Sequence, residues 1–85
     1  MSKNGVGKIQ QVGQDISSGN TVVYCVGTSA EIADSKFSLR IPEGEYAFYS
    51  VEIAKKLRGK TVLFNYLSIS DTRTPRSITF KAVVE

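Results

Sequence analysis

The chain of 85 residues is long enough for one domain and too short for two. Apolar residues make up 41% of it and charged residues 22%, which is ordinary globular usage and excludes a wholly disordered chain. The net charge of +3 is mildly basic and well short of the dense Lys/Arg stripes that make nucleic acid the default partner. We therefore expect a single domain over residues 1–85, with residues 1–4 frayed.

The cysteine and histidine content removes two usual supports of a small fold. Cys25 is the single cysteine, so no disulfide forms within the chain, and no histidine is present to complete a structural zinc site. Because a chain this short has a thin core, self-association is its most natural supplement. We expect no metal, no cofactor and a homo-oligomer.

Membrane and export signals are missing from the sequence pattern. No stretch approaches the ~18 consecutive apolar residues of a membrane-spanning helix. The first five residues lack the apolar core of a signal peptide. We expect no membrane insertion and a cytoplasmic location, or secretion if the chain is a trimmed precursor.

The N-terminal part of the chain predicts a β-hairpin. Residues 5–14 indicate a strand in which Gly7 and Gly13 mark a bulge or a close backbone approach. The composition of residues 15–20 is typical of a turn. Residues 21–26 are β-branched and aromatic on both faces and predict the second strand.

A third strand and a helix follow. Residues 36–41 alternate, with Phe37, Leu39 and Ile41 on the buried face, and Pro42 ends the strand. Apolar side chains then recur at helical spacing and predict a helix over about residues 45–58, at Tyr46, Tyr49, Ile53 and Leu57. Acidic residues near its start, basic residues near its end and Gly59 beyond it match the dipole and cap of a helix.

The C-terminal part predicts two more strands. Residues 60–69 carry apolar side chains on both faces, and residues 70–76 form a polar loop. Residues 77–84 alternate with Ile78, Phe80, Ala82 and Val84 inward. The resulting order β-β-β-α-β-β predicts a β-rich (α+β) fold, a small five-stranded OB-like barrel.

The residues that carry most enzyme chemistry are absent or badly placed. General acid–base catalysis at neutral pH most often uses histidine, and the chain has none. Cys25 lies between Tyr24 and Val26 in an apolar strand, which favours a buried and inert thiol. The eight acidic residues include no close pair suggestive of glycosidase or metal chemistry. We expect that the protein is not an enzyme.

Two surfaces are candidates for binding. OB-folds bind single-stranded nucleic acid with aromatic residues on their β-strands and with the loops after β-strands one and four. The matching residues here are Tyr24, Tyr66, Thr72, Arg73 and Arg76. Alternatively, the loop is solvated and the two tyrosines belong to the core or to an interface.

The helix carries more aromatic surface than one buried stripe needs. Phe48 and Tyr49 are adjacent, so their side chains point about 100° apart on a helix. Together with Tyr46 they predict an oligomer interface. The alternative is an ordinary core with incidental exposure.

The segment from Phe37 to Tyr66 contains an alternating strand, a helix with Ala54, and the Gly59-Lys60-Thr61-Val62 sequence before an aromatic strand. In this pattern it resembles the OB-fold B subunits of AB5 toxins, in particular the pertussis-like and subtilase-cytotoxin-like group. It implies a ring-forming, glycan-binding module whose helices line a central pore. No glycan-contact residue of that family maps onto a position of this chain.

The sequence therefore favours a non-catalytic, self-associating OB-like binding module for a small polar ligand such as a glycan, or for a partner protein. The alternative is a single-stranded nucleic-acid-binding OB-fold protein. Salt dependence separates the two, because phosphate contacts weaken steeply as salt increases.

Overall fold

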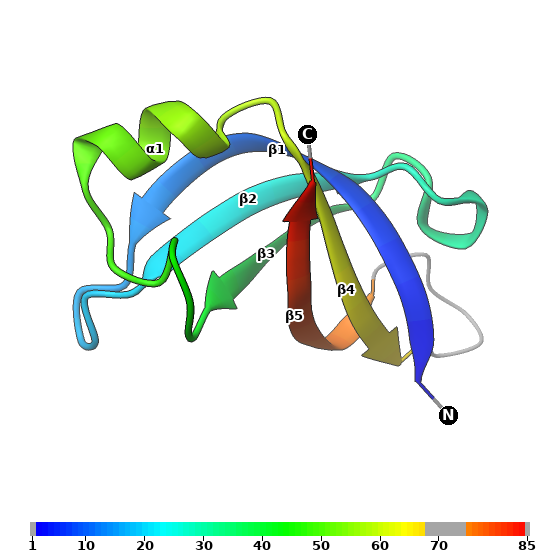
Figure 1. Ribbon diagram of the computed structural model, residues 1–85. Coiled ribbons are helices and arrows are strands. Elements are labelled where there is room, and N and C mark those ends of the chain that lie inside the picture. The colour runs from blue at the N-terminus through cyan, green and yellow to red at the C-terminus, as the bar shows by residue number, and fades with distance from the viewer. Residues whose placement is uncertain (1, 68–74, 85) are drawn as a thin grey trace.

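A computed structural model describes residues 2–67 and 75–84. The described elements follow one another as β1 (Lys3–Gln14), β2 (Thr21–Gly27), the 3-10 turn η1 (Ala30–Ile32), β3 (Lys36–Ile41), α1 (Val51–Leu57), β4 (Thr61–Leu67) and β5 (Arg76–Val84) (Figure 1). The described part of the chain contains no helix with the length and apolar character needed to cross a membrane.

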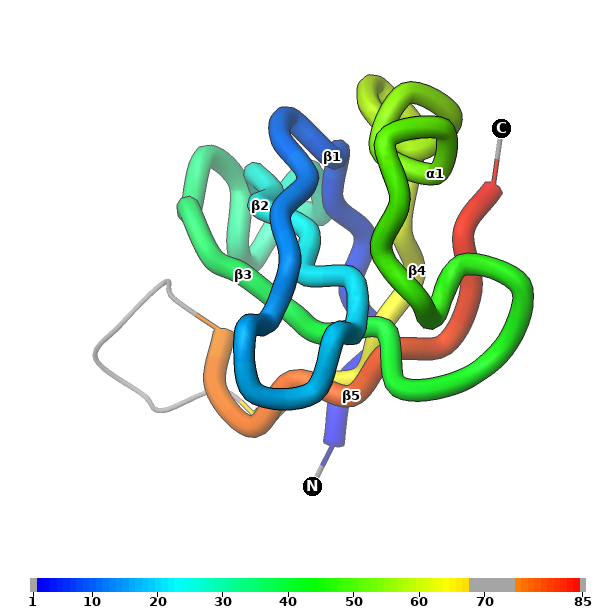
Figure 2. The backbone as a smooth tube through the Cα atoms, turned by 90° about the vertical axis from the view of Figure 1, so that its left-hand side faces the viewer, coloured from blue at the N-terminus to red at the C-terminus, as the bar shows by residue number. Residues whose placement is uncertain are grey.

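The strands form one antiparallel sheet in the order β3-β2-β1-β4-β5. The sheet curls into a half-barrel, so that its two edge strands, β3 and β5, come into contact (Figure 2). The long strand β1 belongs to both sides of the curl, because its residues 3–8 pair with β4 and its residues 7–14 pair with β2. This topology confirms the predicted OB-like order, with a single α-helix between β3 and β4.

Aromatic rings fill the interior of the curl. Phe64 is fully buried at its centre, with its ring centroid 4.9 Å from that of Phe37 and 5.9 Å from that of Tyr66. The rings lie directly over β1, because a Cβ on Gly5 would overlap the Phe64 ring and a Cβ on Gly7 would stand 3.0 Å from Phe37 Cζ. The predicted close approach at Gly7 is thereby confirmed.

Extra residues interrupt the alternation of two strands. In β1, Gln10 is inserted between Ile9 and Gln11, so Ile9 and Val12 both face the core. In β5, Lys81 is the extra residue opposite the step between Leu63 and Phe64.

The insertion in β5 corrects one sequence prediction. Val83 packs on the core, whereas Val84 is 38% exposed, so the predicted inward positions of Ala82 and Val84 are wrong. Alternation continues across a strand only while its register is unbroken.

The helix exists as predicted but begins at Val51, later than the predicted residue 45. Ser50 caps it, because its side chain accepts a hydrogen bond from Ile53 N at 3.1 Å. The preceding segment is bound to β2 instead: Thr21 donates from N to Ala47 O (2.8 Å) and from Oγ1 to Tyr46 O (2.6 Å). Those carbonyl groups are therefore used by the sheet and not by a helix.

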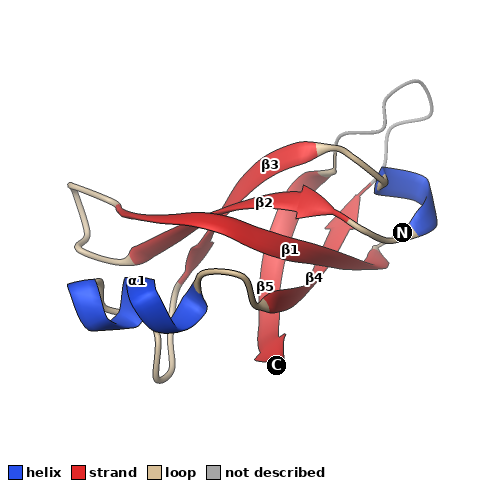
Figure 3. Ribbon diagram, turned by 90° about the horizontal axis from the view of Figure 1, so that it is seen from above, coloured by secondary structure: helices blue, strands red, loops and turns tan. Residues whose placement is uncertain are grey.

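The helix packs against β1 at one end of the half-barrel (Figure 3). Leu57 is its fully buried residue, and Gly59 follows the helix with φ +85°. This left-handed conformation is the one predicted for the residue that closes the helix.

Candidate functional site

A shallow hollow lies on the outer side of β1, β2 and β3. Outward residues of β2 and β3 stand side by side in register, in the pairs Val22–Arg40, Tyr24–Ser38 and Val26–Lys36. The hollow has a volume of about 370 Å³ and is lined by Gln10, Gln11, Tyr24, Cys25, Val26, Lys36, Phe37 and Ser38. We call this surface the β1–β3 face. It includes the strands that OB-folds use to bind their ligands.

Tyr24 stands in the middle of the β1–β3 face. Its side chain is on the solvent side of β2 and the residue is 49% exposed. The ring packs against Gly13 of β1, where a Cβ would stand 3.2 Å from Tyr24 Cε2. Because Gly13 has no side chain, the ring can lie over the neighbouring strand and present a planar apolar surface next to Gln11 and Ser38.

Positive charge surrounds this ring. Lys8, Lys36 and Arg40 are exposed strand residues, and β1, β2 and β3 contain no acidic residue at all. Among the residues that the structure describes, Arg40 has an acidic neighbour, Asp15 Oδ2, at 4.0 Å. Neither Lys8 nor Lys36 has an ion-pair partner in that part of the chain. The face is therefore electropositive.

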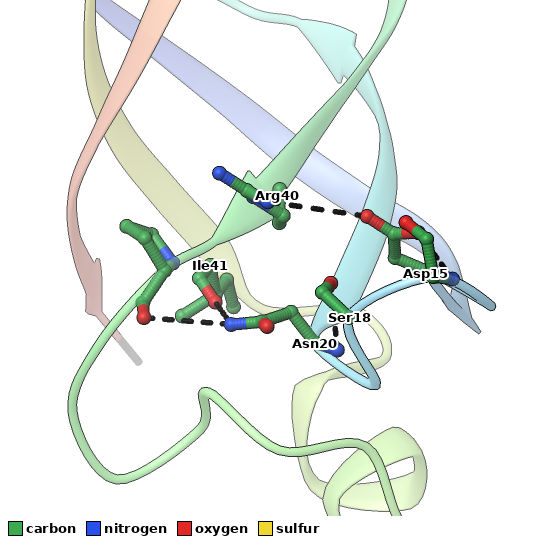
Figure 4. A network of polar contacts seen from close by, with 7 residues as sticks. Asp15, Ser18, Asn20, Arg40 and Ile41 are labelled. Carbon is green, nitrogen blue, oxygen red and sulfur yellow. Dashed lines mark hydrogen bonds and ion pairs between the residues drawn. The ribbon is translucent and has the colours of Figure 1, made fainter.

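The turn between β1 and β2 borders the face and is held by polar contacts (Figure 4). Asn20 Nδ2 donates to Ile41 O at 3.0 Å, which ties the turn to the end of β3. Asp15 Oδ1 accepts hydrogen bonds from Ser17 Oγ (2.8 Å) and Ser17 N (3.0 Å). These bonds are the main reason that the pKa of Asp15 lies below its ordinary value. These hydrogen bonds fix the conformation of the turn at the edge of the face.

Cys25 lies beneath the face and is unsuited to nucleophilic chemistry. Its thiol is buried, and this burial raises the pKa of Cys25 to about 12. A thiol of such high pKa stays protonated at neutral pH, and the thiolate is the reactive form.

The structure separates the two tyrosines that the sequence placed on one binding surface. Tyr66 is 2% exposed, because β4 turns Val62, Phe64 and Tyr66 to the interior. The prediction that Tyr66 contributes to a ligand surface is therefore wrong. Its hydroxyl donates to Glu31 Oε2 at 2.9 Å, and its pKa is raised first by burial and then by this bond.

The other predicted ligand residues either do not line the hollow of the β1–β3 face or lie outside the described residues. Arg76 is exposed at the start of β5. Thr72 and Arg73 lie outside the described residues.

The three aromatics of the predicted oligomer interface do not form one exposed surface. Phe48 is 74% exposed, whereas Tyr46 and Tyr49 are partly buried and Tyr46 packs against the core. The reason is that this segment is not helical: Tyr46 lies in a turn, and Phe48 forms a β-bridge with Asn20. Self-association itself stays a prediction.

Most residues of the β1–β3 face were missed from the sequence. A signal was present: the third strand alternates Lys36, Ser38 and Arg40 on its exposed side, and no acidic residue occurs in the first three strands. Gln10 could not be found in this way, because the bulge that brings it next to the hollow has no local sequence signature.

Comparison of the chain with protein-family models, with curated proteins and with solved structures finds no match.

Proposed function

We propose that the protein binds single-stranded nucleic acid across the β1–β3 face and catalyses no reaction on it. The observation that carries the proposal is the half-exposed Tyr24 ring, set among Lys8, Lys36 and Arg40 on three strands that contain no carboxylate. An aromatic platform within a positive surface is the common device of proteins that bind single strands.

Each part of the face has a role in this interaction. A base stacked on Tyr24 contributes about 1–3 kcal/mol, with little dependence on which base it is. The three cations neutralise phosphates and release condensed counterions. Gln10, Gln11 and Ser38 provide neutral donors and acceptors next to the platform. These groups suit a short single strand of any sequence.

A single strand fits the face better than a duplex does. The bases of a duplex are stacked on one another, so their planar faces cannot contact Tyr24 without unpairing. The hollow is shallow and crosses three strands, and β1, β2 and β3 offer no projecting helix or ribbon that could enter a groove of B-form DNA.

A glycan is the second candidate ligand, in line with the resemblance to toxin B subunits. The observation that favours it is the ring of Tyr24 next to the neutral side chains of Gln11 and Ser38, since sugars stack on aromatic rings and bond to amides and hydroxyls. A neutral glycan leaves Lys8, Lys36 and Arg40 without a binding role, so we place it second.

Fluorescence anisotropy with a labelled oligothymidylate of about 4 nucleotides, which is short enough to occupy the β1–β3 face alone, tests the proposal. Each phosphate contact on a single strand contributes about −0.7 to the slope of log K against log salt, so three contacts predict a slope of about −2. Affinity then falls roughly 20-fold between about 50 and about 200 mM salt. Replacing Tyr24 with Leu lowers affinity about tenfold and leaves this slope unchanged.

Charge variants complete the experiment. The double change K36Q and R40Q reduces the slope to about −0.7, because one cation remains. Lys81→Gln on β5 removes a positive charge outside the face and leaves the slope near the wild-type value, which makes it a control for net charge. Absence of oligonucleotide binding at low salt overturns the proposal. So does a Lys81→Gln variant that lowers the slope by half as much as the K36Q and R40Q double variant, because each charge would then act alike wherever it lies. Salt-insensitive binding to a neutral glycan would favour the second candidate instead.

A further inference from the structure

A second hollow adjoins the β1–β3 face, between α1 and β1. It has a volume of about 270 Å³ and is lined by Gln11, Val12, Val51, Ala54, Lys55 and Arg58. Gln11 lines both this hollow and the one around Tyr24. The two hollows therefore meet at the bulge of β1, and we call the second one the α1–β1 groove.

The residues that follow α1 are attached to β1 by three hydrogen bonds. Gly59 N donates to Ile9 O at 2.9 Å, and Ile9 N donates to Lys60 O at 2.8 Å. Arg58 Nε donates to Gln10 O at 3.5 Å. These bonds hold Arg58 beside the bulge residue Gln10, which lines the hollow around Tyr24.

The groove combines an apolar floor with a positive rim. Val12, Val51 and Ala54 supply the apolar surface, while the exposed Lys55 of α1 and Arg58, the residue that follows the helix, supply the positive charge. Neither of these two cations has an acidic partner within ion-pair distance anywhere in residues 2–67 or 75–84. The rim therefore matches the charge of a phosphate backbone, and the floor matches the apolar part of a nucleotide.

We infer that the single strand bound on the β1–β3 face continues over the β1 bulge into the α1–β1 groove, where Lys55 and Arg58 bind its phosphates. This inference rests on the proposed function and extends it, since it specifies the path of the strand and a longer site. The simpler role of both cations is to complement the C-terminal end of the helix dipole. If that were their only role, replacing the two cations would lower the stability of the helix and would affect short and long oligonucleotides equally.

The test is a length series of oligothymidylates of about 4, 8, 12 and 16 nucleotides, the range of site sizes that OB-folds cover. Wild-type affinity rises with length until both hollows are occupied. The double variant K55Q and R58Q binds the shortest oligonucleotide like the wild type and loses roughly five- to tenfold for the longest. Its salt slope with the longest oligonucleotide is smaller by about 1.4, which corresponds to two phosphate contacts.

Lys55→Gln and Lys56→Gln form the matched pair of single variants. Both residues are exposed on the same helix, and Lys55 lines the groove whereas Lys56 does not. Lys55→Gln reduces the slope for long oligonucleotides, and Lys56→Gln does not. Circular dichroism verifies that each variant is folded.

Two results overturn the inference while the proposed function stands. In one, the affinity of the K55Q and R58Q double variant depends on oligonucleotide length as that of the wild type does. In the other, Lys55→Gln and Lys56→Gln reduce the salt slope for long oligonucleotides equally. Failure of the wild type to bind any oligonucleotide overturns the proposed function and this inference together, so the two failures are distinguishable.

Discussion

The ring of Tyr24 on β2 covers Gly13 on β1, at a position where any side chain would come within 3.2 Å of ring atom Cε2. The two residues are diagonal neighbours, since Gln11 is the direct partner of Tyr24 and Val22 that of Gly13. An aromatic ring that lies over a cross-strand glycine is restrained without being buried. The orientation of the proposed stacking platform therefore depends on the absence of a side chain one strand away.

Gly13→Ala is expected to shift the Tyr24 ring by a few tenths of an ångström and to weaken oligonucleotide binding roughly twofold, because the stacking surface moves while the cations remain. The salt slope should be unchanged. The double variant G13A and Y24L should bind no more weakly than Y24L alone, since both changes act on the same platform. Additive losses measured by anisotropy would contradict this coupling.

Gly5→Ala is expected to destabilise the protein by about 1–3 kcal/mol, because the new methyl group overlaps the buried Phe64 ring. Urea unfolding monitored by circular dichroism measures the change. If overlap is the cause, the loss for Gly5→Ala should be smaller in a Phe64→Leu background, where the ring is absent. An equal loss in both backgrounds would assign the effect to the β1 backbone instead.

Acidic pH is expected to release the contact between Glu31 and its two partners. Lys3 Nζ lies 2.7 Å from Glu31 Oε1, and this hydrogen bond and that from Tyr66 lower the pKa of Glu31 below its ordinary value of 4.5. Because the pKa of Glu31 is lower in the folded protein than in the unfolded chain, its carboxylate stabilises the fold above about pH 4.5. This stabilisation is lost as the pH falls further and the carboxylate becomes protonated.

The comparison of wild type with Glu31→Gln isolates this contribution from the other carboxylates. The difference in free energy of unfolding should favour the wild type at neutral pH and shrink as the pH falls through the acidic range. A difference that stays constant from about pH 7 to about pH 3 would show that the charge of Glu31 is not responsible.

Cys25 is expected to resist thiol reagents in the folded protein. With a pKa of about 12, roughly one thiol in 10⁴ is ionised at pH 8, compared with about one in ten for a thiol at the ordinary value of 9.0. Ellman's reagent should therefore react at least about 10³-fold more slowly with native protein than with protein in denaturant. Rapid labelling without denaturant would mean that β2 opens readily.

The order of the elements along the chain and the approximate bounds of the strands could be predicted because periodicity and turn composition are local. The third strand, Lys36–Ile41, has its predicted bounds, since Pro42 ends its alternation. The start of the helix could not be predicted in this way. Tyr46 and Tyr49 have helical spacing, but Thr21, distant in sequence, takes the Tyr46 and Ala47 carbonyl groups for the sheet. Tertiary hydrogen bonds here override a periodic pattern.

The candidate site was predictable only in part. Tyr24 could be found because its type and its strand are evident from the sequence. Tyr66 looked equivalent to Tyr24 in the sequence. Side chains alternate along β4, but this alternation does not show which side faces the interior when apolar residues occupy both sides. The neighbourhood of Gln11, which connects the two hollows, depends on a bulge whose position is set by the register of β1 against β2.

The double membership of β1 has a consequence for local unfolding. Lys8 is paired with Val26 on one side and with Thr61 on the other, so neither half of the sheet can separate without disturbing the strand that both halves use. Amide protons of β1 and β4 should therefore exchange with solvent as one cooperative unit. A molecule bound at Tyr24 would then slow exchange on β4, a strand that lies outside the β1–β3 face.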